Sequence, residues 1–127
     1  MHDAPSTKEL LEAVKRFIDD TASPQLTGHA AFHARVASNV LSTLIRELEQ
    51  RPEAESAERT RLVALLGAAP DTSLEDLNRD LCKRIQSGEM DLSSDGLLDH
   101  LKTTTIAQLS IDQPRYSGLA LALQARG

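Results

Sequence analysis

The stretch HAAFHARVASNVLSTLIRELEQ, residues 29–50, decides the fold class. Within it an apolar residue returns at every fourth position, at Phe32, Val36, Val40, Leu44 and Leu48. Residues four apart lie on the same side of an α-helix, so this spacing predicts a long helix with one apolar stripe. We expect this helix to run from about Thr27 to Gln50.

Apolar residues recur at helical spacing in most of the remaining chain. A capping-box pattern at Ser6 and Glu9 begins the first helix, and Pro52 suits the first turn of a helix that Gly67 ends. The expected helices cover residues 6–22, 27–50, 52–66, 73–87 and a fifth segment from 93 or 94 to 113. Residues 117–127 alternate Leu with Ala, which fits a strand-like segment and a short helix equally well. The sequence therefore predicts an all-α bundle of five to six helices, mostly antiparallel, with a docked C-terminal tail.

Composition limits the class of protein. With 127 residues, 40% of them hydrophobic, the chain can bury the core of a single helical domain over residues 1–127. The net charge is −5 with both signs mixed along the chain, so a basic surface for nucleic acid is excluded. One cysteine, Cys82, fits a reducing compartment, and the chain shows neither an apolar run of about 18 residues nor a secretory signal. We expect a cytoplasmic protein that contacts no membrane.

Two histidines one helical turn apart, His29 and His33, are the sharpest chemical feature. This spacing allows two imidazoles to hold one metal ion, but a third ligand would have to come from His100, His2 or a carboxylate. The histidines share the sector of the apolar stripe, so we expect them to point inward. The alternative that we favour is a pair of partly buried histidines bonded to neighbouring groups, with no metal.

Polar residues also continue the apolar side of the fifth helix, at Thr104, Thr105 and Gln108. One explanation is a polar pocket between the second and fifth helices that faces His33, with Asn39 beside it. The simpler explanation is that this half of the helix is partly exposed, or that the threonine hydroxyls bond back to carbonyls one turn earlier. Both remain open from the sequence.

The segment that follows the fifth helix contains Asp112, Arg115 and Tyr116 around Pro114. Arg115 could bind an anionic ligand or a carboxylate, and the tyrosine could pack its ring and bond through its hydroxyl. A rigid turn with an internal ion pair is the favoured interpretation. The candidate binding residues are His29, His33, Asn39, Thr105, Gln108, Asp112, Arg115 and Tyr116.

Three stretches stand out together: FHARVASNVL (32–41), LCKRI (81–85) with Gly88 and Asp91, and LSIDQPRYS (109–117). They resemble a known bacterial family of small helical domains of unknown function. The resemblance extends over nearly the whole chain. Members of that family occur with, or fused to, kinases that are similar to aminoglycoside phosphotransferases. The resemblance therefore implies a kinase partner and supplies no catalytic residues.

Three functions follow as hypotheses. We favour a non-catalytic accessory domain that binds another protein, with the apolar tail as part of that interface or of a homodimer contact. The alternative is a small-molecule or metal-binding domain that uses the pocket between the second and fifth helices. An enzyme acting alone is the least favoured, because the sequence offers no activated nucleophile and no acid–base pair. Neither a cofactor nor a catalytic residue is expected.

Overall fold

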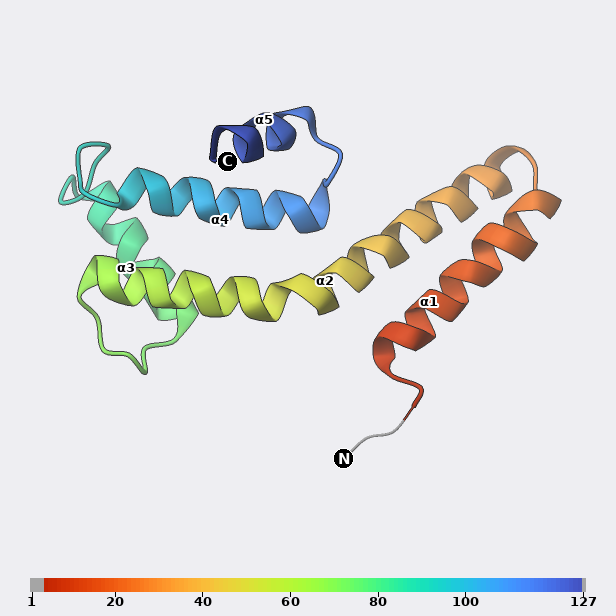
Figure 1. The fold of residues 1–127 in the computed structure, drawn as a ribbon, viewed down its shortest axis with the longest axis horizontal. Helices are drawn as coiled ribbons and strands as arrows, with labels where there is room; N and C mark the ends of the chain where they lie inside the picture. Colours follow the sequence, from red (N-terminus) through yellow and green to blue (C-terminus); the bar gives the residue numbers. More distant parts are fainter. Residues whose placement is uncertain (1–3, 127) are drawn as a thin grey trace. The chain divides into compact units, whose positions relative to one another are not determined.

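A computed structural model describes residues 4–126, and all regular secondary structure in this part of the chain is helical (Figure 1). The predicted all-α class is confirmed. A π-helical turn (Ile18–Ala22) and a 3-10 turn (Ser23–Gln25) connect the first two helices. The helices are α1 (Thr7–Phe17), α2 (Gly28–Leu66), α3 (Leu74–Gln86), α4 (Leu97–Asp112) and α5 (Ser117–Arg126).

The chain divides into two compact units, Met1–Arg51 and Pro52–Gly127, which we call unit 1 and unit 2. Helix α2 contributes its N-terminal part to unit 1 and its C-terminal part to unit 2. That the whole chain acts as one domain stays a prediction. None of the helices in residues 4–126 has the length and apolar character needed to cross a membrane.

The prediction of a new helix at Pro52 is wrong, because α2 continues through this proline. Proline has no N–H, so the carbonyl of Leu48 loses its helical partner at this point. The residues that follow, up to Leu66, are largely Ala, Glu, Arg and Leu, which favour helix and allow it to continue. The boundary between the two units falls immediately before this proline.

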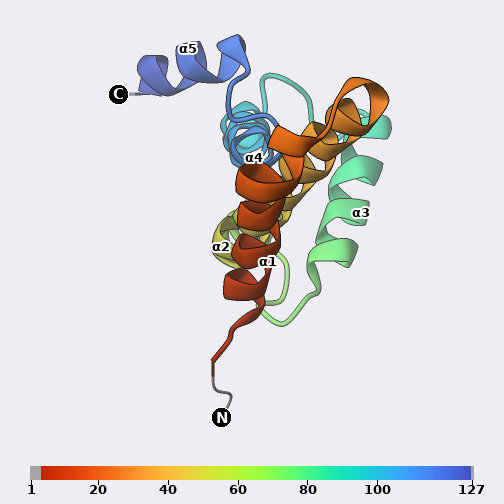
Figure 2. The same cartoon turned by 90° about the vertical axis from the view of Figure 1, so that its right-hand side faces the viewer.

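Unit 2 has an aliphatic core. The C-terminal part of α2 runs antiparallel to α4, whereas α3 crosses α4 steeply (Figures 1 and 2). Their apolar faces meet in one cluster. Its buried members are Leu62, Leu66, Leu77, Leu81, Met90 and Leu97.

Local signals explain most helix ends in unit 2. The hydroxyl of Ser73 accepts a hydrogen bond from the Asp76 N–H and caps α3. Gly67 follows α2 with φ of 64°, the left-handed conformation expected of it. Helix α4, in contrast, begins later than predicted. The Asp91 N–H donates to the Ser94 hydroxyl and closes a separate turn, so α4 starts only after that turn.

The tail is a helix, which settles the choice between strand and helix left open by the sequence. Helix α5 contacts α4, and Leu119 is buried. Its other leucines, Leu121 and Leu123, are exposed. The docked C-terminal tail is thus confirmed in helical form.

Candidate functional site

Unit 1 is a helical hairpin whose register is fixed by two polar contacts. The Lys8 ammonium lies 2.6 Å from the Glu49 carboxylate, and the Ser38 hydroxyl donates to Asp19 over 2.6 Å. The bond to Glu49 raises the pKa of Lys8, while bonds from Lys15 and then Ser38 lower the pKa of Asp19. Both contacts give the same antiparallel alignment of α1 with α2.

The inner side of this hairpin contains apolar residues, but none of those described is fully buried. Ser38 is the one buried residue among the described residues of unit 1, and every buried apolar residue of the described chain belongs to unit 2. Leu11, Ile18, Leu41 and Ile45 lie on the inner side and are partly buried. Two helices joined this way have only a small hydrophobic core of their own. Short helices in water depend on such tertiary packing for their stability.

A second set of apolar residues lies on one outer side of the hairpin. In both helices an apolar row stands one residue before the inward-facing row. Consecutive residues are rotated by about 100° around the helix axis. Because the two helices are antiparallel, the residue that precedes an inward-facing residue points to the same outer side of the hairpin in both. The register places these residues in three layers, which we call the hairpin face: Leu10 with Leu48, Val14 with Leu44, and Phe17 with Val40.

The six residues of the hairpin face keep 44–59% of their surface exposed. With about half of each side chain open, they present on the order of 600 Å² of apolar surface. Phe32 and Val36 are also exposed and extend the α2 row toward its N-terminus. The hairpin face is therefore an apolar surface that no described residue of unit 1 covers.

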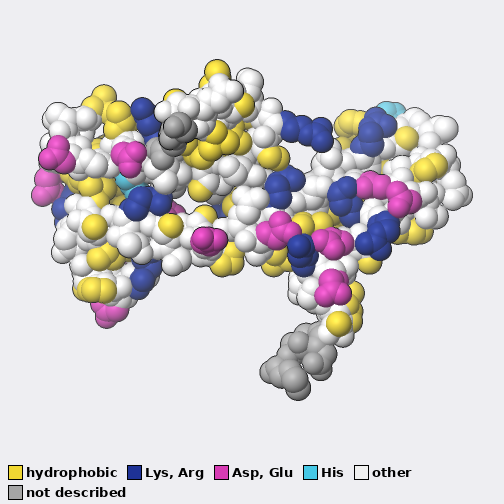
Figure 3. All heavy atoms as spheres, in the orientation of Figure 1, with side chains coloured by type: hydrophobic (Ala, Val, Ile, Leu, Met, Phe, Trp, Pro, Cys, Tyr) yellow, Lys and Arg dark blue, Asp and Glu magenta, His cyan; other side chains and the backbone are white. Residues whose placement is uncertain are grey.

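The opposite side of the hairpin is polar. Space-filling spheres show Lys, Arg, Asp and Glu side chains mixed over the part of the hairpin seen in Figure 3. Several are paired within the hairpin, as in the Lys15–Asp19 bridge at 2.6 Å and the Glu47–Arg51 bridge at 2.5 Å. The hairpin is thus amphipathic as a whole.

The prediction that His29 and His33 point into the core is wrong, since both are exposed. The His33 ring instead meets the Phe32 ring edge-on, with centroids 5.5 Å apart. The side of α2 that faces α1 is set by Ser38 and Leu41, so the sector that carries the histidines turns outward. Asn39 is exposed as well.

No group of three or more His, Cys, Asp or Glu side chains within residues 4–126 is arranged to hold a metal ion. His2, one of the ligands considered, lies outside the described residues.

The five candidate residues of unit 2 are also exposed. The Thr105 hydroxyl donates to the Leu101 carbonyl over 2.8 Å, which confirms the simpler explanation for that side chain. Gln108 donates to the Asp112 carboxylate over 2.6 Å. These residues and the histidines belong to different units, so the pocket proposed between them stays a prediction.

The turn after α4 has the form that its proline suggested. The Tyr116 N–H donates to the Gln113 carbonyl over 3.0 Å, which closes a turn around Pro114. Arg115 is exposed on this turn. Tyr116 leads into α5, where its ring lies beside Gly118.

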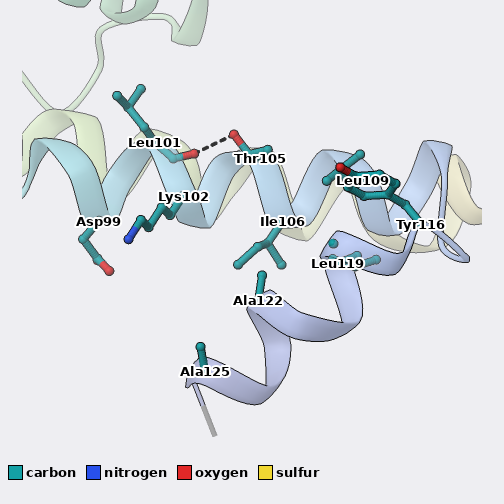
Figure 4. A pocket seen from close by; sticks show the side chains of 11 residues that line it. Asp99, Leu101, Lys102, Thr105, Ile106, Leu109, Tyr116, Leu119, Ala122 and Ala125 are labelled. Carbon is teal, nitrogen blue, oxygen red and sulfur yellow. Dashed lines mark hydrogen bonds between the residues drawn. The ribbon is translucent and has the colours of Figure 1, made fainter.

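A groove of about 790 Å³ lies between α4 and α5 (Figure 4). Ile106 and Leu109 from α4 and Leu119 and Ala122 from α5 supply apolar walls, and Tyr116 lines it too. Asp99 and Lys102 are its charged members. Of the eight candidate residues, Thr105 and Tyr116 line this groove. Its volume lies within the range of small-molecule sites.

A polar cluster around the buried His100, which was not predicted from the sequence, joins α2 to α4. Arg61 Nε donates to His100 Nδ1 over 3.3 Å, and Arg61 Nη2 donates to the Thr104 hydroxyl over 3.1 Å. His100 is 3% exposed, and burial followed by the Arg61 charge lowers its pKa. A signal did exist, because His100 follows Leu97 at helical spacing on the buried side of α4.

A neutral imidazole that accepts from Arg61 at Nδ1 carries its proton on Nε2. Arg61 and His100 line a second hollow of about 330 Å³. The cluster offers one acid–base group beside a guanidinium, without a nucleophile among its lining residues. We assign it to the packing of α2 against α4.

Comparison with known proteins gives one match. No curated protein and no solved structure matches the chain. A family model described as a domain of unknown function, DUF6285, matches residues 24–116. This match covers α2, α3 and α4 completely and leaves out α1 and α5. Because it spans most of the chain, the protein belongs to the DUF6285 family of domains of unknown function.

Proposed function

We propose that this protein is a non-catalytic accessory domain that associates with another protein chain through its hairpin face. The observation that carries the proposal is the contrast within unit 1. Six of its apolar residues are about half exposed in three layers on one outer side, while none of its described apolar residues is fully buried. An exposed apolar area on the order of 600 Å² matches the largest patch of a typical monomer, and such patches are commonly functional.

The geometry supports docking better than catalysis. A helical surface with layered aliphatic side chains suits another helix or helix pair, which can pack side chains between its rows. The polar cluster at His100 is occupied by structural bonds to Arg61. The thiol of Cys82 is free and exposed, which agrees with a cytoplasmic location.

For the partner we propose a phosphotransferase-like kinase, as the family resemblance implies. Titration calorimetry of the purified chain with such a kinase from the same host tests this directly. We expect binding by the natural chain and its loss in Leu44→Asp, which places a charge in the middle layer.

Asn39→Asp is the matched control, since it adds the same charge at another exposed position of α2, on the polar side. Loss of binding in both variants, or in neither, would argue against the hairpin face as the docking surface.

A second candidate function is binding of a small amphipathic molecule in the groove between α4 and α5. The observation in its favour is the groove itself, with apolar walls and the Lys102 ammonium among its lining groups. The sole tyrosine of the chain, Tyr116, lines it, and the chain contains no tryptophan. Intrinsic fluorescence therefore reports on this groove, and a ligand that enters it is expected to change that emission.

A further inference from the structure

We infer that the hairpin face is occupied by a second copy of this chain, so that two hairpins form a four-helix bundle. This inference rests on the proposed function and names the chain that meets the face. A phosphotransferase-like kinase would then bind the dimer and not the single chain, at a surface other than the hairpin face. Leu44→Asp would therefore abolish kinase binding by separating the two copies.

The layers have the pattern of half a bundle. Leu10, Val14 and Phe17 follow each other at spacings of four and three residues, as core positions of bundled helices do. The row of α2 keeps a spacing of four from Val40 to Leu48. Because both rows sit on one side of an antiparallel pair, two copies related by a two-fold axis bring all four rows into one core.

The area agrees with what a stable dimer needs. Two hairpin faces of on the order of 600 Å² each would bury about 1,200 Å² in total, and Phe32 and Val36 raise this to about 1,600 Å². This range is that of specific, stable interfaces. The same burial would enlarge the small hydrophobic core of unit 1, so folding of the hairpin and association reinforce each other.

Charge does not oppose this pairing. The three layers contain no charged residue, and the Lys8–Glu49 and Lys15–Asp19 bridges involve residues outside the layers. Two copies can therefore approach without taking an unpaired charge out of water, which is the costly step in forming an interface. If the net negative charge of the chain lay on the hairpin face, the faces of two copies would instead repel each other.

Sedimentation equilibrium of the full chain over a wide concentration range tests the inference. We expect twice the chain mass at high concentration for the natural chain and for Asn39→Asp. Leu44→Asp is expected to weaken association at least a hundredfold, and Leu44→Ala, which adds no charge, at least tenfold. Circular dichroism at matched concentration shows whether each variant keeps the helical signal of unit 2.

Three results would overturn the inference. The first is a natural chain that stays monomeric at every concentration. The second is a dimer that Leu44→Asp and Leu44→Ala leave unchanged. The third is a monomer that binds the kinase through the hairpin face, with binding lost in Leu44→Asp but not in Asn39→Asp. This last result removes the second copy but keeps the proposed docking function, so the two failures are distinguishable.

Discussion

Replacing leucine by alanine at two positions of α2 distinguishes a buried position in the core of unit 2 from an exposed position on the surface of unit 1. Leu62 is 0% exposed within the aliphatic cluster, whereas Leu44 is 44% exposed in the hairpin face. Leu62→Ala removes buried methyl groups and leaves a cavity, which costs about 2–5 kcal/mol of unfolding free energy. Leu44→Ala removes groups that are already half in water, so about 1 kcal/mol is expected in a single copy.

Urea denaturation followed by circular dichroism measures both losses. The comparison belongs at a concentration where sedimentation shows single copies, because association would add to the cost at Leu44. At higher concentration we expect the Leu44→Ala loss to grow and the Leu62→Ala loss to stay constant. A single-copy loss at Leu44 as large as that at Leu62 would refute the assignment of the hairpin face as an open surface.

Two further predictions concern unit 2. Burial lowers the pKa of His100 in the folded chain. The unfolded chain therefore takes up a proton near pH 6.5 while the folded chain does not. The free energy of unfolding is thus expected to fall as the pH drops below about 6.5. His100→Gln is expected to reduce that slope in denaturation midpoints measured from pH 7.5 to 5, and an unchanged slope would contradict the role of His100. In Gly118→Ala the new methyl would lie 2.5 Å from a ring carbon of Tyr116, so the ring must turn away. Tyrosine emission is expected to change while Ala120→Gly, an exposed control in α5, leaves the ring in place; equal spectra in all three proteins would count against this packing.

The all-α class could be predicted from sequence because helical periodicity is local. The apolar row of Val40, Leu44 and Leu48 could be predicted from local spacing, without information on residues far away in the sequence. A helical pattern shows which side of a helix is apolar, but not where a neighbouring helix will pack. Here α1 contacts α2 through Ser38 and its neighbours, one step around the helix from that row. The inward placement of His29 and His33 failed for this reason.

Other features depended on contacts that spacing does not encode. Arg61 and His100 are far apart in sequence and meet only when α2 lies beside α4. Continuation of α2 through Pro52 was missed because proline at that place is equally suited to starting a helix. The groove between α4 and α5 required the tail to be helical, which the alternation of Leu with Ala left undecided.

Amide hydrogen exchange over a concentration series tests most directly whether the hairpin face is completed by a second copy. Exchange in residues 37–51 is expected to slow markedly as the concentration rises, while exchange in α3 stays the same. Leu44→Asp should remove this concentration dependence, and Asn39→Asp should retain it. If exchange in residues 37–51 proceeds at the same rate at every concentration, whether fast or slow, the proposal that a second copy covers the hairpin face is contradicted.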